Sequence, residues 1–120
     1  MFKVTSLDVR PVSVLCKALG DETRVRIVGL LAQGELCVCH IEKALGLLQA
    51  NASRQLAILR SAGIVEPRRD GNWTYYRLAE QKGDHRKRLL RAVVSDFGKQ
   101  DVLREDVERV RKLVGPGSCR

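Results

Sequence analysis

Apolar residues at helical spacing predict two helices in the first third of the chain. The first follows Pro11, because an apolar stripe recurs there at i, i+3, i+4 and i+7; its members are Val12, Leu15, Cys16 and Leu19. Asp21 is a suitable N-cap for a second helix over residues 22–32, and Gly34 fits its C-terminal end. Because Cys16 belongs to the apolar stripe of the first helix, we expect it to be a small buried hydrophobe of the core.

Two shorter periodic segments follow, separated by a glycine. Residues 38–45 predict a third helix that Gly46 ends, and residues 50–62 predict a fourth that ends at Gly63. Two helices joined by a short turn have the length and spacing of a helix-turn-helix, which we place at residues 38–62. Leu48 stands where a capping Ser or Thr is expected. The residues expected to anchor the fourth helix in the core are Leu56, Ile58 and Leu59.

The period then changes from helical to alternating. Residues 64–69 and 72–78 predict two strands, and the Asp70-Gly71 dipeptide between them is a strong signal for a tight hairpin. This hairpin forms a wing over residues 64–78. Beyond Gly83 the helical period returns in two apolar stripes, which predict one or two C-terminal helices over residues 85–114. A flexible tail, residues 115–120, is expected after them.

The order of these elements predicts a mainly α fold with a β-hairpin wing, a winged helix-turn-helix. Its 120 residues form a single domain, residues 1–120. The first helix and the C-terminal helices carry apolar stripes that a compact helix-turn-helix core has little room to bury. Pairing two chains about a two-fold axis would bury them. We therefore expect a homodimer that dimerises through its terminal helices.

The charge balance indicates a polyanionic partner. The formal net charge is +8 and the isoelectric point about 9.8, an excess typical of nucleic-acid-binding domains. The longest apolar runs, such as residues 27–32, are too short to cross a bilayer. Residues 1–9 lack the apolar centre of a signal peptide. We expect a cytoplasmic protein that binds double-stranded DNA and no membrane.

Candidate DNA contacts lie at the start of the fourth helix and on the wing. In a helix-turn-helix the second helix enters the major groove with its N-terminal residues toward the bases. Gln and Asn can pair with adenine, Arg with guanine, and Ser with either base. The predicted base readers are Gln49, Asn51, Ser53, Arg54 and Gln55. The predicted contacts to phosphates or the minor groove are Arg68, Arg69 and Asn72.

Cys37 and Cys39 lie at the entrance to the third helix, where the positive end of the helix favours thiolates. In a cytoplasmic chain, four cysteines indicate reduced thiols or metal ligands more than two disulfides. Residues i and i+2 lie on roughly opposite sides of an α-helix, so both sulfurs can bind one ion only if this turn is extended or unwound. Ion binding would then be coupled to the first helix of the DNA-binding motif.

Four blocks of sequence resemble the arsenic-repressor (ArsR/SmtB) family of metal-sensing winged helix-turn-helix transcriptional repressors. In chain order they are LGDETR at 19–24, ELCVC at 35–39, ANASRQL at 50–56 and GNWTYYRL at 71–78. The resemblance spans about residues 15–78. It implies a homodimeric repressor that leaves its operator, an inverted repeat, when an ion binds. It also implies operators that precede efflux or arsenical-resistance genes.

Departures from the family pattern narrow the choice of ion. Arsenite-sensing members often carry a third cysteine three residues after the second, where this chain has Glu42. Residues 1–15 lack the cysteines that cadmium- and lead-sensing members carry in an N-terminal arm. The Asp, His and Glu set of zinc-sensing members is absent from the helix after the wing. The leading function, as the resemblance implies, is a repressor that As(III), or Sb(III), releases by binding Cys37 and Cys39.

The third ligand of the ion stays open at this point. As(III) takes three thiolates, so a further sulfur is needed, either from Cys119 in the Gly-Pro-Gly tail or from an external thiol. Cys16 is a less favoured ligand. His40 would favour zinc or cadmium, and the simpler interpretation makes it a solvated residue of the first helical turn.

Two alternatives keep the same fold, and a third changes the class of protein. The first is a Cd, Pb or Zn sensor, and the second is a sensor in which the two thiols oxidise or form persulfides. An enzyme would need a redox CxxC motif or a nucleophile with an orienting His, and the sequence shows neither. The chain is therefore predicted not to be an enzyme.

Overall fold

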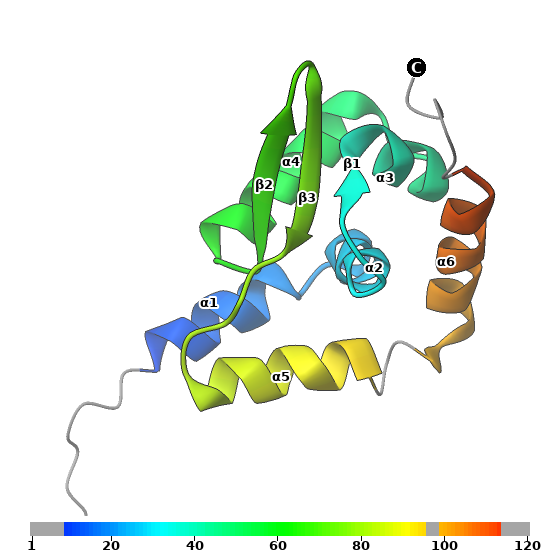
Figure 1. The fold of residues 1–120 in the computed structure, drawn as a ribbon. Helices are drawn as coiled ribbons and strands as arrows, with labels where there is room; N and C mark the ends of the chain where they lie inside the picture. Colours follow the sequence, from blue (N-terminus) through cyan, green and yellow to red (C-terminus); the bar gives the residue numbers. More distant parts are fainter. Residues whose placement is uncertain (1–8, 96–98, 114–120) are drawn as a thin grey trace, which may run out of the picture.

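The computed structural model describes residues 9–95 and 99–113, and it has the predicted winged helix-turn-helix architecture (Figure 1). In chain order the elements are α1 (Arg10–Ala18), α2 (Glu22–Leu31), β1 (Leu36–Cys37), α3 (Val38–Leu45), α4 (Gln49–Ser61), β2 (Val65–Asp70), β3 (Trp73–Leu78), α5 (Asp84–Ser95) and α6 (Asp101–Leu113). No helix within the two described ranges is long and apolar enough to cross a membrane.

The core forms around α2, which packs against α3, α4, α5, α6 and β3. Its fully buried side chains come from α1, α2, α3, α4 and the start of the wing, among them Leu15, Ile27, Leu30, Ile41, Leu56, Leu59 and Ile64. Burying one such side chain contributes about 1.5–3 kcal/mol. The prediction that Ile58 anchors α4 is wrong, because Ile58 is 37% exposed. Successive helical residues are turned by about 100°, so Ile58 points away from the core that Leu59 enters.

The helix ends follow the capping signals of the sequence. The Asp21 carboxylate accepts a hydrogen bond from the backbone N–H of Arg24 at 3.3 Å, so Asp21 caps α2 as predicted. Gly46 ends α3 with a φ of +64°, a left-handed conformation that favours glycine. Leu48 occupies the N-cap of α4 with no side-chain cap and is 81% exposed. A tight turn therefore joins α3 and α4, the two helices of the DNA-binding motif, and α4 starts without a side-chain cap.

The wing is a three-stranded antiparallel sheet with the strand order β1-β3-β2. Asp70 ends β2 and pairs with Trp73, so the hairpin loop is Gly71-Asn72, one residue later than the predicted Asp70-Gly71. Gly71 has a φ of +61°, and a positive φ at the first loop position is what a type II′ turn requires. The sequence did not predict β1, because two residues are too few to show an alternation.

The C-terminal segment contains two helices, and α6 returns to pack against α2 and α3 (Figure 1). Asp106 of α6 is fully buried and accepts hydrogen bonds from Nε and Nη2 of Arg26 in α2, at 2.8 and 2.7 Å. These bonds raise the pKa of Arg26. Arg109 also pairs with Asp106, and its Nε donates to the carbonyl of Ala44 in α3 at 2.8 Å. The C-terminal helix is thus bound both to α2, at the centre of the core, and to α3, the first helix of the DNA-binding motif.

Candidate nucleic-acid interface and thiol site

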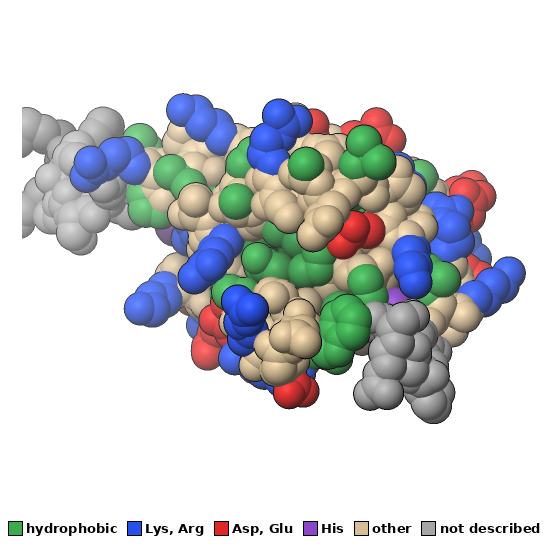
Figure 2. Space-filling view, turned by 90° about the horizontal axis from the view of Figure 1, so that it is seen from above, with side chains coloured by type: hydrophobic (Ala, Val, Ile, Leu, Met, Phe, Trp, Pro, Cys, Tyr) green, Lys and Arg blue, Asp and Glu red, His purple; other side chains and the backbone are tan. Residues whose placement is uncertain are grey.

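The N-terminal end of α4 and the tip of the wing lie at the same end of the molecule, at the top of Figure 1. Among the predicted base readers, Gln49, Ser53 and Arg54 are exposed and Asn51 is half-buried. Figure 2 looks onto the molecule from above and shows Lys and Arg side chains spread around the edge of this face. The arrangement brings polar reading residues and positive charge to one surface, as contact with DNA requires.

Gln55 lies apart from the other predicted readers, because it is only 7% exposed. Its Oε1 accepts a hydrogen bond from Nη1 of Arg24 in α2 at 2.8 Å, and its Nε2 donates to Oδ1 of Asn51 at 3.0 Å. Sequence reasoning did not single out Arg24 for any role on α4. The sequence contained Arg24 only as the last residue of the block at 19–24. That block gives no indication of a contact with Gln55, which lies 31 residues later.

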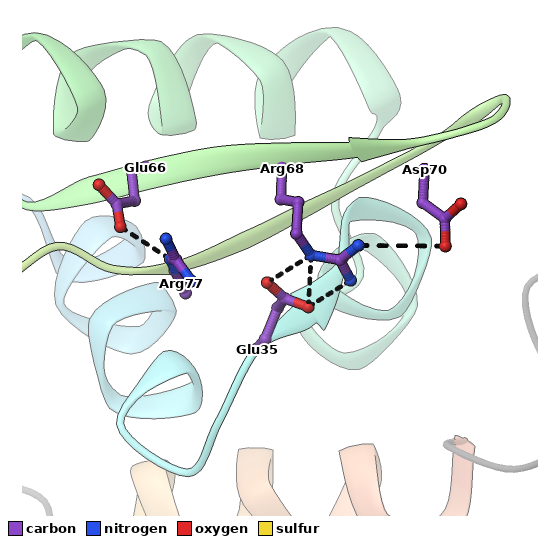
Figure 3. Close-up of polar contacts among 5 residues, drawn as sticks. All are labelled: Glu35, Glu66, Arg68, Asp70 and Arg77. Carbon is purple, nitrogen blue, oxygen red and sulfur yellow. Dashed lines mark hydrogen bonds and ion pairs between the residues drawn. The ribbon is translucent and has the colours of Figure 1, made fainter.

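The surface of the wing carries ion pairs, which Figure 3 shows in close-up. Nε and Nη2 of Arg68 donate to the carboxylate of Glu35, with a shortest distance of 2.6 Å, and the Arg68 guanidinium lies 4.8 Å from the centre of the Tyr75 ring. Nε of Arg77 donates to Glu66 at 2.7 Å. The hydrogen bond from Arg68 lowers the pKa of Glu35 and raises that of Arg68. Arg69 and Asn72 are exposed at the tip.

Cys37 and Cys39 lie side by side where β1 ends and α3 begins. Cys37 is a free cysteine, whereas Cys39 is disulfide-bonded, so the expectation of reduced thiols is wrong for Cys39. Cys37 is the N-cap of α3 with extended dihedrals, φ −67° and ψ 145°, and its side chain is 2% exposed. The sulfurs of Cys37 and Cys39 are 3.3 Å apart, well beyond the length of about 2.05 Å for a disulfide bond. The predicted requirement for an extended turn is therefore met, because Cys37 belongs to a strand and only Cys39 to the helix.

A pocket of about 310 Å³ adjoins the two thiols. Besides Cys37 and Cys39, it is lined by Glu42 of α3, by side chains from one face of α4 and by the hairpin end of the wing. The α4 residues are Gln49, Ser53 and Leu56, and the wing residues include Asn72, Trp73 and Thr74. Cys37 and Cys39 thus share one cavity with both elements that are predicted to contact DNA.

Among the remaining candidate ligands, Cys16 and His40 lie outside this pocket. Cys16 is exposed on α1, so the prediction that it belongs to the core is wrong; its neighbour Leu15 enters the core instead. His40 is 7% exposed, so the prediction of a solvated residue is also wrong, and burial, with a smaller effect of Lys43, lowers its pKa. His40 does not line the thiol pocket. Cys119 lies outside the described residues, and within them no three His, Cys, Asp or Glu residues form a cluster that could hold a metal.

Comparison with known proteins decides the family. Residues 21–67 match the model of the bacterial regulatory proteins of the arsR family. The chain is 42% identical over 101 residues to the arsenic resistance transcriptional regulator ArsR1 of Pseudomonas putida, a match that covers 83% of this chain and 77% of the relative. The chain belongs to the arsR family. It is accordingly a winged helix-turn-helix transcriptional repressor that binds DNA, and not an enzyme.

Further relatives of this arsR-family chain agree. It is 50% identical over 66 residues to the arsenical resistance operon repressor of Escherichia coli, a match that covers 54% of this chain and 56% of that protein. The transcriptional repressor BigR of Xylella fastidiosa has the same fold, with a TM-score of 0.67, 35% identity and coverage of 78% and 89%. A winged helix-turn-helix domain of Mycobacterium bovis, described as homodimeric, superposes with a TM-score of 0.63, 36% identity and coverage of 83% and 94%.

Proposed function

We propose that this repressor senses As(III), which binds Cys37 and Cys39 and releases the protein from its operator. The observation that carries the proposal is the separation of 3.3 Å between the two sulfurs at the junction of β1 and α3. Two thiolates on one tetrahedral zinc, each bonded at about 2.3 Å, are themselves about 3.8 Å apart. Once Cys39 is reduced, the two sulfurs therefore need little movement to share one ion.

The chemistry of the donors favours a soft ion. Thiolates select soft metals and metalloids over ions that prefer oxygen, and relatives of this chain are named for arsenic resistance. The harder donor of the pocket is Glu42, whereas His40, which would favour zinc or cadmium, does not line it. As(III) and Sb(III) then take a third sulfur from Cys119 or from an external thiol. We propose that the regulated genes confer arsenical resistance.

The position of the thiols supplies a route from ion binding to DNA release. Cys37 pairs with Tyr75 of β3 in the wing, and Cys39 lies in the first turn of α3, which leads into α4. An ion that bonds both sulfurs fixes the angle between β1 and α3. It also occupies the pocket between α4 and the hairpin end of the wing. Both changes alter the relative placement of the two DNA-contacting elements, and this lowers affinity for the operator.

We further propose that two copies of the chain bind an inverted repeat as a homodimer. Apolar side chains remain exposed on the terminal helices: Val14 of α1 is 44% exposed and Leu89 of α5 is 36% exposed. A homodimeric structural relative supports the same assembly. Two reading helices related by a two-fold axis contact half-sites about 34–36 Å apart. Sedimentation should show a dimer at micromolar concentration, and a monomer both with and without DNA would contradict this part of the proposal.

The decisive experiment measures DNA release by fluorescence anisotropy under reducing conditions. The labelled duplex is one that the parent protein selects from a random pool, and the titrants are arsenite, antimonite, Cd²⁺, Pb²⁺ and Zn²⁺. Arsenite and antimonite should release the DNA at the lowest concentrations. Cys37→Ser and Cys39→Ser should each bind the duplex nearly as the parent does and lose the release, because serine keeps the size but not the soft sulfur. Cys16→Ser, which removes an exposed thiol on α1, is the matched control and should respond as the parent does.

Other outcomes assign the site differently. Release by Cd²⁺, Pb²⁺ or Zn²⁺ at lower concentrations than arsenite would make the chain a sensor of that metal. Release by peroxide or polysulfide alone would make it a thiol redox sensor. A Cys37→Ser, Cys39→Ser double variant that still releases DNA with arsenite would place the sensing site elsewhere. Cys119→Ser tests the third ligand, because a strong loss of response assigns it to Cys119 and a small effect assigns it to an external thiol.

A further inference from the structure

A chain of three polar side chains runs from α2 into the first turn of α4. Arg24 lies in α2, and its guanidinium is held by the carbonyls of Ala18 and Lys17, at 2.6 and 3.3 Å. Its Nη1 donates to Oε1 of Gln55 at 2.8 Å, and Nε2 of Gln55 donates to Oδ1 of Asn51 at 3.0 Å. Gln55 is buried, and Asn51 is half-buried in the first turn of the helix that is predicted to contact DNA.

The hydrogen bonds among these three side chains fix the orientation of the amide groups of Gln55 and Asn51. A guanidinium has only donors, so Gln55 must turn its oxygen toward Arg24 and its NH₂ group toward Asn51. An NH₂ group has only donors as well, so Asn51 must turn its oxygen toward Gln55. The NH₂ group of Asn51 then faces away from Gln55. The orientation at the surface is thus set by a charged residue of another helix, 27 positions earlier in the sequence.

We propose that Gln55 is a positioning residue that presents Asn51 to DNA as a hydrogen-bond donor and thereby determines which base α4 accepts. The inference rests on the proposed contact of Asn51 with a base edge. In the major groove guanine presents two acceptors and thymine one, whereas the polar group of cytosine is a donor. A donor at Asn51 therefore favours guanine or thymine at one position of each half-site and rejects cytosine.

One substitution reverses this orientation without breaking the link to α2. Gln55→Glu keeps an oxygen for Arg24 and replaces the donor beside Asn51 with a second oxygen. That oxygen attracts the NH₂ group of Asn51, so the amide turns and its own oxygen faces DNA. The preference at the same position should then change to cytosine or adenine, which carry amino donors in the major groove. Because the new carboxylate faces the Arg24 guanidinium, the variant keeps a partner for its charge.

The test compares the sequences that each protein enriches from a random duplex pool. The parent should enrich guanine or thymine over cytosine by about fivefold at one position of the half-site, and Gln55→Glu should invert that preference there. Asn51→Asp keeps an oxygen facing Gln55 and turns an acceptor toward DNA in place of the donor. It should therefore lose the preference for guanine or thymine at the same position and favour cytosine or adenine there. Ala57→Glu adds a charge at an exposed site of α4 and should lower affinity without changing any preferred base. A thermal melt confirms that each variant is folded.

The outcomes separate this inference from the function on which it rests. If the parent enriches no sequence, specific reading by α4 fails and the positioning role fails with it. If the parent enriches a motif and Gln55→Glu enriches the same base at every position, the role of Gln55 is overturned while the repressor function stands. An unchanged motif in Asn51→Asp also overturns it, because Asn51 then reads no base. Inversion at a single position, the same one at which Asn51→Asp loses its preference, supports the inference.

Discussion

Arg68 of the wing donates three hydrogen bonds to the carboxylate of Glu35, which lies two residues before Cys37 (Figure 3). The guanidinium also rests on the ring of Tyr75, the residue that pairs with Cys37 across the sheet. In the free protein, therefore, this charge holds the β2–β3 hairpin against the segment that leads into β1 and Cys37. Its neighbour Arg69 is exposed at the tip.

The two arginines should differ in their effect on the salt dependence of DNA binding. Arg69→Ala should reduce the slope of log K against log salt by about one unit for each phosphate that Arg69 neutralises in the parent complex. Arg68→Ala should reduce the slope by less, because Glu35 already neutralises that charge. Glu35→Gln is the complementary control and should strengthen binding to random DNA by freeing Arg68. An equal reduction of the slope in Arg68→Ala and Arg69→Ala would mean that Arg68 leaves Glu35 for a phosphate in the complex.

Trp73 should report ion binding directly. It is the single tryptophan of the chain and lines the same pocket as Cys37 and Cys39. Arsenite should therefore change the intensity or wavelength of its emission, with an end point of one ion per chain. The Cys37→Ser, Cys39→Ser double variant should show no change, and Cys16→Ser should titrate as the parent does. Release of DNA without any change in emission would argue against an ion in this pocket.

The uncapped start of α4 should be open to stabilisation. Leu48 has extended dihedrals, φ −70° and ψ 148°, and its side chain makes no cap. Leu48→Ser should raise the free energy of unfolding by about 0.5–1 kcal/mol, because the hydroxyl can accept from a free N–H of the first turn. The substitution sacrifices little burial, since Leu48 is 81% exposed. Val9→Ser is the control: Val9 precedes α1 with helical dihedrals, which do not suit a cap, so chemical denaturation should show no gain.

The buried Asp106 should contribute strongly to stability. Asp106→Asn keeps the size of the side chain but removes the charge that accepts hydrogen bonds from Arg26 and Arg109. The free energy of unfolding should fall by about 2–3 kcal/mol, as is usual when hydrogen bonds between charged groups are broken. Asp101→Asn changes an exposed carboxylate in the same helix and should leave stability nearly unchanged. Equal denaturation midpoints for the two variants would contradict the structural role given to Asp106.

Features that depend on neighbouring residues could be predicted from the sequence. The span of α3 at 38–45, the cap at Asp21 and the end of α3 at Gly46 agree with the structure, because periodicity and capping act within a few residues. The same holds for the placing of Cys37 and Cys39 at the start of α3. The sequence signal places the hairpin one residue early, since both Asp70-Gly71 and Gly71-Asn72 contain the glycine that the turn needs.

Contacts between segments that are distant in the sequence were decided only by the tertiary structure. Cys37 is extended because β1 pairs with β3, whose residue Tyr75 lies 38 positions later. Gln55 resembles a reader in the sequence and is buried because Arg24 lies beneath it. Cys16 was expected to be buried and is exposed, whereas His40 was expected to be exposed and is buried. An apolar stripe shows that a helix has a buried side, but the elements that pack against the helix determine how far that side extends.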